Sequence, residues 1–479
     1  MSGKRTLGHW LFWLSLVGGT AVFLFAVRFP PTMLQALLLA WYATGDQVGE
    51  EYGYAVASAG DVNGDGYDDI IVGAPHYDDA AYAGGAAFVF YGSAGGLSDQ
   101  PDWTGGSELN GARFGAAVAS AGDVNHDGYD DVLIGAYRAN NEQPEEGRAY
   151  LYLGSAQGLA TVPAWTFESD QKEAQLAYSV AGAGDVNNDG YDDVIIGARW
   201  YDGALANEGA AFLFFGSAAG LSTAPDWTAV GGQVGAAFGT AVSSAGDTNH
   251  DGYDDLLVGA AFYDDTQTDE GAAFLFLGGT NPDTVPDWQA VGGQADSLFG
   301  ASVAAADFNQ DGRADILVGA PHFSNEVDGE GGVFLYLGSE QLMSSTAVWS
   351  NFSRQEGALY GTAVATGDLN GDALPDLIVG APQYTHDQQF EGRVFLYVGA
   401  PGMVSALASW TGDGNKAETA FGQSAGPAGD VDGDGYGDLV VGAPQYRLNR
   451  DLVGRALVYQ GAEKISSDHV VFLPVVVQE

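Results

Sequence analysis

One acidic loop occurs seven times along this chain, at intervals of 60–62 residues. The first copy, Asp61 to Asp69, reads D-V-N-G-D-G-Y-D-D, with oxygen-bearing side chains at positions 1, 3, 5 and 9. Glycine stands at position 6 in six of the seven copies, where it permits a sharp turn. Seven copies in register restrict the chain to a repeat architecture. The loops begin at Asp61, Asp123, Asp185, Asp247, Asp307, Asp368 and Asp430.

This pattern is typical of a loop that binds a hard cation through carboxylates, amides and one backbone carbonyl. We predict up to seven Ca²⁺ ions, one per repeat, each held by the side chains at positions 1, 3, 5 and 9 and the carbonyl at position 7. The predicted ligand residues are Asp61, Asn63, Asp65, Tyr67, Asp69, Asp123, Asn125, Asp127, Tyr129, Asp131, Asp185, Asn187, Asp189, Tyr191, Asp193, Asp247, Asn249, Asp251, Tyr253, Asp255, Asp307, Asn309, Asp311, Arg313, Asp315, Asp368, Asn370, Asp372, Leu374, Asp376, Asp430, Asp432, Asp434, Tyr436 and Asp438.

Two loops depart from the common pattern. In the sixth, Ala373 replaces the turn glycine, and its Cβ is expected to strain the turn and weaken the site. In the seventh, Asp432 replaces asparagine, which makes this the most acidic set. An EF-hand is excluded because position 12 of the first loop is Val72, inside a strand pattern, rather than glutamate. The alternative is a set of acidic turns without an ion, in which the carboxylates would repel one another.

The composition limits the classes of partner. The 479 residues include 63 acidic and 16 basic ones, for a net charge of −47, which argues against nucleic acid and anionic membrane surfaces as partners. The chain has no cysteine, so no disulfide framework supports it. Its 72 glycines indicate many short strands and turns rather than helices.

The amino terminus differs in kind from the repeats. Lys4 and Arg5 precede an apolar stretch from Leu7 to Val27, which as a helix is long enough to cross a bilayer. We therefore expect residues 1–40 to be either a cleaved signal peptide or an uncleaved membrane anchor. Both alternatives export the remaining chain to the extracellular space or the cell surface.

Each repeat contains four short strands. A tryptophan strand precedes an aromatic-glycine pair, a small-residue strand leads into the acidic loop, and two apolar strands follow, as in Trp41 to Tyr91. The fold class is therefore all-β: a seven-bladed propeller of four-stranded antiparallel blades over residues 41–461. The last repeat ends at Gln460 without a tryptophan strand, so we expect the strand near Trp41 to close the ring. Residues 462–479 form a tail that could add an edge strand.

The chain resembles the FG-GAP repeat family, which includes the seven-bladed propeller of integrin alpha subunits. The pairs Phe114-Gly115, Phe238-Gly239, Phe299-Gly300 and Phe421-Gly422 match the first element. The triplets Gly73-Ala74-Pro75, Gly319-Ala320-Pro321, Gly380-Ala381-Pro382 and Gly442-Ala443-Pro444 match the second. The resemblance implies the propeller fold and metal binding. Unlike integrin subunits, however, all seven blades here carry a metal loop, and no leg domains or cysteines are present.

The expected function is an adhesive, integrin-alpha-like module whose ligand is an extracellular protein or polysaccharide. The face opposite the acidic loops carries the segments that vary most among copies: 76–84, 138–146, 199–208, 261–270, 322–330, 383–391 and 445–453. Six of them hold an aromatic residue that either faces a partner or, as we favour, packs under its own loop: Tyr77, Tyr201, Tyr263, Phe323, Tyr384 and Tyr446. We expect no enzyme, because no catalytic motif is present. The alternatives are a polysaccharide-acting enzyme with its site in the central channel, or a structural envelope protein.

Overall fold

The computed structural model describes residues 16–17, 20–21, 37–78, 81–339, 342–400 and 402–463. The chain divides into two units, Met1–Leu34 and Gln35–Glu479. In the first, β1 (Leu16–Val17) pairs with β2 (Thr20–Ala21). The predicted export segment and the predicted tail lie almost entirely outside the described residues. Within the described part of the chain, no helix is long and apolar enough to cross a membrane.

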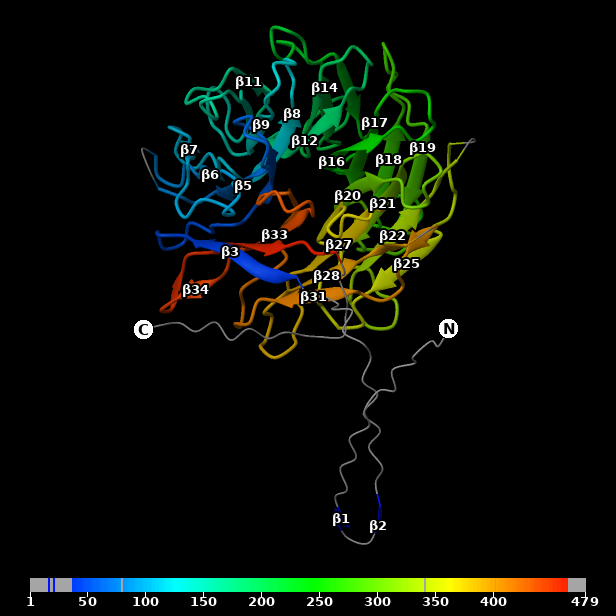
Figure 1. Cartoon of the computed structure of the whole chain (residues 1–479). Helices are drawn as coiled ribbons and strands as arrows, with labels where there is room; N and C mark the ends of the chain where they lie inside the picture. Colours follow the sequence, from blue (N-terminus) through cyan, green and yellow to red (C-terminus); the bar gives the residue numbers. More distant parts are fainter. Residues whose placement is uncertain are drawn as a thin grey trace, which may run out of the picture. The chain divides into compact units, whose positions relative to one another are not determined.

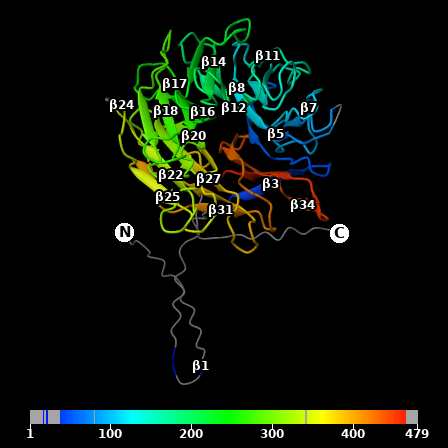
Figure 2. The same cartoon turned by 180° about the vertical axis from the view of Figure 1, so that it is seen from behind.

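The second unit contains seven four-stranded antiparallel sheets that follow one another around a ring (Figures 1 and 2). The first four blades are formed by β4 (Val56–Gly60), β5 (Asp69–Ala74), β6 (Ala86–Phe90) and β7 (Trp103–Gly106); β8 (Ala117–Gly122), β9 (Asp131–Ala136), β10 (Arg148–Tyr152) and β11 (Trp165–Glu168); β12 (Leu176–Gly184), β13 (Asp193–Ala198), β14 (Ala210–Phe214) and β15 (Trp227–Val230); and β16 (Phe238–Gly246), β17 (Asp255–Ala260), β18 (Ala272–Phe276) and β19 (Trp288–Val291).

The last three blades follow the same order with small additions. They are formed by β20 (Ser302–Ala306), β21 (Asp315–Ala320), β22 (Gly332–Tyr336) and β25 (Trp349–Phe352); β26 (Ala363–Gly367), β27 (Asp376–Ala381), β28 (Arg393–Tyr397) and β31 (Trp410–Asp413); and β32 (Ala425–Gly429), β33 (Asp438–Ala443), β36 (Arg455–Gln460) and β3 (Leu38–Thr44). Three two-stranded hairpins sit in the loops: β23 (Gly338–Ser339) with β24 (Leu342–Met343), β29 (Gly399–Ala400) with β30 (Met403–Val404), and β34 (Arg447–Leu448) with β35 (Asp451–Leu452).

The ring closes with a strand from the far end of the sequence, as predicted. β3 pairs antiparallel with β36, and Tyr42 lies opposite Leu457. In Figure 1 the blue β3 lies beside the red end of the chain. The first strands of the blades also contact one another in a closed circuit, from β4 through β8, β12, β16, β20, β26 and β32 back to β4. The amino-terminal β3 therefore supplies the outer strand of the seventh blade and leaves β36 without an unpaired edge.

The hydrophobic core lies between adjacent blades. One cluster joins Ile71 and Val89 of the first blade to Val132 and Ile134 of the second, and equivalent clusters occupy the other junctions. A four-stranded sheet therefore buries both faces only by stacking on its neighbours. Glycines of the two repeated motifs allow this approach, because a Cβ on Gly73 would lie 1.9 Å from the carbonyl oxygen of Gly115 in the next blade.

Candidate metal centres

Each acidic loop is the hairpin connection between the first and second strands of its blade. The loop after β4 holds positions 1 to 8, and position 9 is Asp69, the first residue of β5. The same arrangement recurs in all seven blades. All the loops consequently lie on one face of the ring, together with the turns between the third and fourth strands.

The side chains at positions 1, 3 and 5 turn inward on their own loop. Asp61 Oδ2 accepts a hydrogen bond from Gly66 N–H at 2.8 Å, and Asp65 Oδ1 accepts one from Tyr67 N–H at 3.1 Å. The bond from position 6 to position 1 is present in every loop, at 2.7–2.9 Å. The position-7 residues, whose carbonyls we predicted as ligands, follow directly in the turn.

The sixth loop keeps this geometry although it lacks the glycine. Ala373 adopts a φ of 62°, close to the left-handed conformation of the glycines, and its N–H donates to Asp368 Oδ2 at 2.7 Å. A left-handed residue with a Cβ costs roughly 1–2 kcal/mol. The strain that the sequence predicts at Ala373 therefore has a specific backbone origin.

The position-9 aspartates are fully buried beneath the loops. Asp69 Oδ2 accepts from Val62 N–H at 3.1 Å and Oδ1 from Gly92 N–H at 2.8 Å, and both bonds recur in the other blades. Burial raises the pKa of Asp69 to about 8 and that of Asp193 to about 7. A cation beside these carboxylates would favour their charged form.

The seventh loop brings three carboxylates together. Ligand atoms of Asp430, Asp432 and Asp434 all lie within 4.8 Å of one another. Burial, followed by repulsion from Asp434, raises the pKa of Asp432. Asp438 directs its oxygens to the backbone N–H groups of Val431 and Gly461. Three of the four predicted side-chain ligands therefore meet at one point, and the fourth supports the loop from below.

The donor set fits a hard cation. In the second, third and fourth loops, the Oδ1 atoms of Asn125, Asn187 and Asn249 are buried and accept no hydrogen bond from the described residues. A buried amide oxygen without a partner is costly. A Ca²⁺ ion bound in each loop would be coordinated by this position-3 amide oxygen together with the carboxylates at positions 1 and 5.

The residue at position 8 links neighbouring loops, a role that we did not predict. Asp130 Oδ2 accepts from Asp61 N–H of the preceding blade at 2.8 Å, and Asp130 N–H donates to the Asp61 carbonyl at 3.2 Å. The same pair of bonds joins Asp123 to Asp192, Asp185 to Asp254 and Asp430 to Asp68. Burial raises the pKa of Asp130 and its three counterparts. In the sequence, the only sign of this link between blades is the Asp-Asp pair that recurs at positions 8 and 9.

The recurring tryptophan also links blades. Trp103 Nε1 donates to the carbonyl oxygen of Ala160 in the next blade at 2.9 Å, and Trp165 Nε1 does the same to Ser222. Equivalent bonds run from Trp41, Trp227 and Trp288. The sequence shows the period of the tryptophan but not its partner, which lies 56 or 57 residues further along the chain.

Comparison with known proteins decides the family. The FG-GAP repeat model matches seven segments that together cover more than half of the chain: 52–90, 114–152, 176–214, 238–276, 299–336, 360–397 and 421–459. The chain belongs to the FG-GAP repeat family. Its relatives include integrin alpha-6 of Gallus gallus, 35% identical over 173 residues, and integrin alpha-3 of Cricetulus griseus, 36% identical over 165 residues. These alignments cover 34% and 32% of this chain but only 15% of each relative.

On the opposite face of this FG-GAP propeller, the aromatic residues of the variable segments pack inward. The ring of Tyr201 meets Phe212 edge-on at 5.4 Å, and that of Phe323 meets Phe334 at 5.1 Å. Tyr77, Tyr263 and Tyr384 make the same contact within their own blades, and Tyr446 is buried. The interpretation that each ring packs under its own loop is confirmed.

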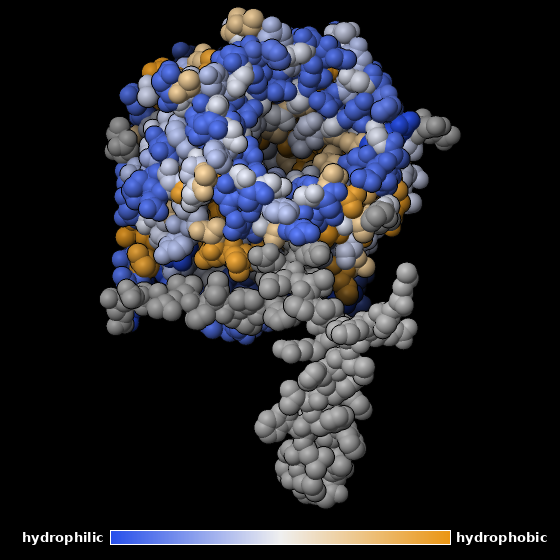
Figure 3. Space-filling model, in the orientation of Figure 1, coloured by the Kyte–Doolittle hydropathy of each residue, from blue (hydrophilic) through white to orange (hydrophobic). Residues whose placement is uncertain are grey.

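The FG-GAP propeller is hollow at its centre (Figure 3). A cavity of about 340 Å³ is lined by the first strands of all seven blades, with Tyr54, Tyr137 and Tyr178 on one side. Ser, Thr, Gln, Ala and Val complete the lining, and none of the described residues that line it is Asp, Glu or His. The cavity therefore offers hydroxyl and aromatic contacts rather than a pair of carboxylates.

Proposed function

We propose that this FG-GAP propeller is a calcium-loaded, extracellular module that binds a protein or polysaccharide ligand at the cell surface. The observation that carries the proposal is the contrast between its two faces. One face repeats the same acidic loop seven times, whereas the other presents seven segments that differ in sequence and length. A uniform, metal-stabilised scaffold that displays variable loops is suited to recognition.

The relatives support the same role. The chain matches integrin alpha subunits of vertebrates and of Drosophila melanogaster. Because the chain covers only about 15% of those proteins, we carry over ligand binding but not pairing with a second subunit. We assign export to residues 1–40 and calcium binding to all seven loops, since millimolar extracellular Ca²⁺ would load sites of moderate affinity.

The central cavity favours binding over hydrolysis. Glycoside hydrolysis in most families requires two carboxyl groups that flank the scissile bond, whereas the described lining of the cavity offers hydroxyl, amide and phenol groups. The acidic residues of the metal face are committed to backbone N–H groups and, in our proposal, to Ca²⁺. We therefore place ligand recognition on the variable face rather than catalysis in the channel.

The test is a binding assay with the purified, labelled full-length chain, added to the cells that produce it and to a panel of extracellular polymers. We expect saturable binding in millimolar Ca²⁺ and loss of binding in chelator. A double variant of the seventh loop, Asp430→Asn with Asp434→Asn, should weaken binding only if Ca²⁺ loading matters. A folded, Ca²⁺-loaded chain that binds nothing in the panel, yet turns over one of its polymers, would refute the adhesive role.

A further inference from the structure

A second repeated acidic residue lies on the variable face, opposite the metal loops. A glutamate immediately precedes the glycine before the third strand in five blades, and each is buried: Glu146, Glu208, Glu270, Glu330 and Glu391. Glu391 Oε1 accepts hydrogen bonds from the N–H groups of His386, Asp387 and Gln388 at 2.7–3.1 Å. This carboxylate therefore organises the variable segment of its blade.

The second oxygen of this glutamate is hydrogen-bonded in the third, fourth and fifth blades but not in the sixth. In the third, fourth and fifth blades, Oε2 accepts an N–H from the loop after the fourth strand: from Gly232, Gly293 and Arg354. Glu391 Oε2 is buried and has no hydrogen-bond partner among the described residues, although its side chain is 0% exposed. A buried carboxylate oxygen without a partner is costly and indicates a missing ligand.

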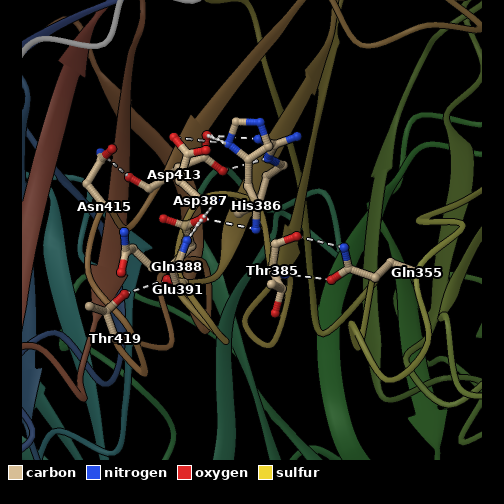
Figure 4. Close-up of polar contacts among 10 residues, drawn as sticks. Gln355, Thr385, His386, Asp387, Gln388, Glu391, Asp413, Asn415 and Thr419 are labelled. Carbon is tan, nitrogen blue, oxygen red and sulfur yellow. Dashed lines mark hydrogen bonds and ion pairs between the residues drawn. The ribbon is translucent and has the colours of Figure 1, made fainter.

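Two further potential ligands surround this glutamate (Figure 4). Ligand atoms of His386, Glu391 and Asp413 all lie within 4.8 Å of one another. Asp413 is the last residue of β31 and is almost fully buried, and the Arg393 guanidinium holds it through contacts of 2.6 and 2.9 Å. His386 Nδ1 lies 3.7 Å from Asp413 Oδ2 and 3.9 Å from Asp387 Oδ2.

The charges of this group balance a divalent cation. Glu391, Asp413 and Asp387 contribute three negative charges and Arg393 one positive charge, which leaves two negative charges around the imidazole of His386. Imidazole together with carboxylates suits Zn²⁺ and similar transition metals, whereas the seven acidic loops offer only oxygen ligands. We propose that His386, Glu391 and Asp413, with Asp387 at the rim, form a transition-metal site of the Zn²⁺ class. The ion would fasten segment 383–391 to β31.

The second blade shows what the histidine adds. It has the same buried glutamate, Glu146, whose Oε2 is likewise without a partner, and the same arginine–carboxylate pair, Arg148 with Glu168. The position of His386 is taken there by Asn141, which donates to Glu168 Oε1 at 3.1 Å. The scaffold is thus common to both blades, and only the sixth supplies a nitrogen ligand.

The test uses the untagged full-length chain in millimolar Ca²⁺, which occupies the acidic loops, titrated with Co²⁺ and followed by visible absorption. We expect one equivalent of Co²⁺ to produce d–d bands that Zn²⁺ then abolishes. His386→Asn, which recreates the arrangement around Asn141, should lose these bands while keeping the wild-type melting temperature in Ca²⁺. His322→Gln removes an exposed histidine from the neighbouring blade and should leave the bands unchanged.

Two results would overturn the proposal. Retention of the Co²⁺ bands in His386→Asn would place the bound metal elsewhere. Absence of a Co²⁺ signal from the folded wild-type chain would leave His386 with its ion-pair contacts to Asp413 and Asp387 and without a metal-binding role. Neither result bears on adhesion, because ligand binding and its dependence on Ca²⁺ are measured separately.

Discussion

On the metal face, each blade meets the preceding blade through the position-8 residue of its acidic loop. These junctions differ between blades one to four and blades five to seven. At the first group, position 8 is aspartate, which accepts the N–H of position 1 in the preceding loop through Asp68, Asp130, Asp192 and Asp254. At the second group, position 8 is Ala314, Pro375 or Gly437, which have no carboxylate to accept this bond. Pro375 also lacks an N–H, so the backbone bond is impossible there as well.

The other face does not share this division. Gln171 makes two hydrogen bonds with the backbone of Asp202 in the next blade, and Gln355 makes the same pair with Thr385 at the junction of the fifth and sixth blades. The strained Ala373 loop lies in the weakly linked half. The glutamine link therefore occurs in both groups of blades, whereas the carboxylate link of the metal face occurs in only one, and Ca²⁺ has more to contribute in blades five to seven.

Removal of Ca²⁺ should have the largest effect. At a dissociation constant of ~0.1 mM, ~1 mM Ca²⁺ stabilises by ~1.4 kcal/mol per site, or on the order of 10 kcal/mol for seven sites. We expect chelation to lower the melting temperature by on the order of 10 °C. In chelator, the backbone amides of the loops at 307–315, 368–376 and 430–438 should exchange their hydrogens faster than those of the loops at 61–69 and 123–131. An unchanged melt would exclude a structural role for the ions, and uniform exchange would exclude the division between the halves.

Loss of an aromatic ring from the variable face should destabilise the protein equally, whether the ring lies in blades one to four or in blades five to seven. Tyr201→Ala in the third blade and Phe323→Ala in the fifth each remove a partly buried ring that packs on the same blade. We expect each to lower the free energy of unfolding by about 3 kcal/mol, measured by urea denaturation in saturating Ca²⁺. Ligand binding should persist in both. A cost confined to one half would show that the asymmetry extends beyond the metal face.

The sequence predicts the fold because the information is local and repeated. The acidic loop, its flanking strands and the incomplete last repeat together indicate seven blades and closure through the strand near Trp41, which pairs with β36 as expected. The links between blades could not be predicted in the same way. Asp61 and Asp130 are 69 residues apart and Asp68 and Asp430 are 362 residues apart, so their contact depends on how neighbouring sheets stack. Ligation of Ca²⁺ by the predicted residues stays a prediction.

Removal of one carboxylate link should have a moderate effect. Asp130→Ala deletes the acceptor of the Asp61 N–H at 2.8 Å while leaving the predicted ligands of both loops in place. A hydrogen bond to a charged group contributes about 1.5–3 kcal/mol, so we expect a loss of about 2 kcal/mol in urea denaturation with Ca²⁺ present. Asp99→Ala, at an exposed turn residue, is the control and should change stability little. Equal costs for the two variants would show that the link contributes nothing.

Introduction of an aspartate at a junction that lacks one should have the smallest effect on stability. It tests the geometry of the junction directly. In the four linked junctions, the aspartate packs against a glycine of positive φ just before position 1, as Asp130 does against Gly60. Gly246, with a φ of 61°, occupies that place opposite Ala314, so Ala314→Asp should fit and stabilise by about 1 kcal/mol. Ala306 stands there opposite Pro375, and its Cβ fills the space that glycine leaves. Pro375→Asp should therefore give no such gain. Stabilisation by both substitutions would mean that added charge near the Ca²⁺ loops, rather than the geometry of the junction, is responsible.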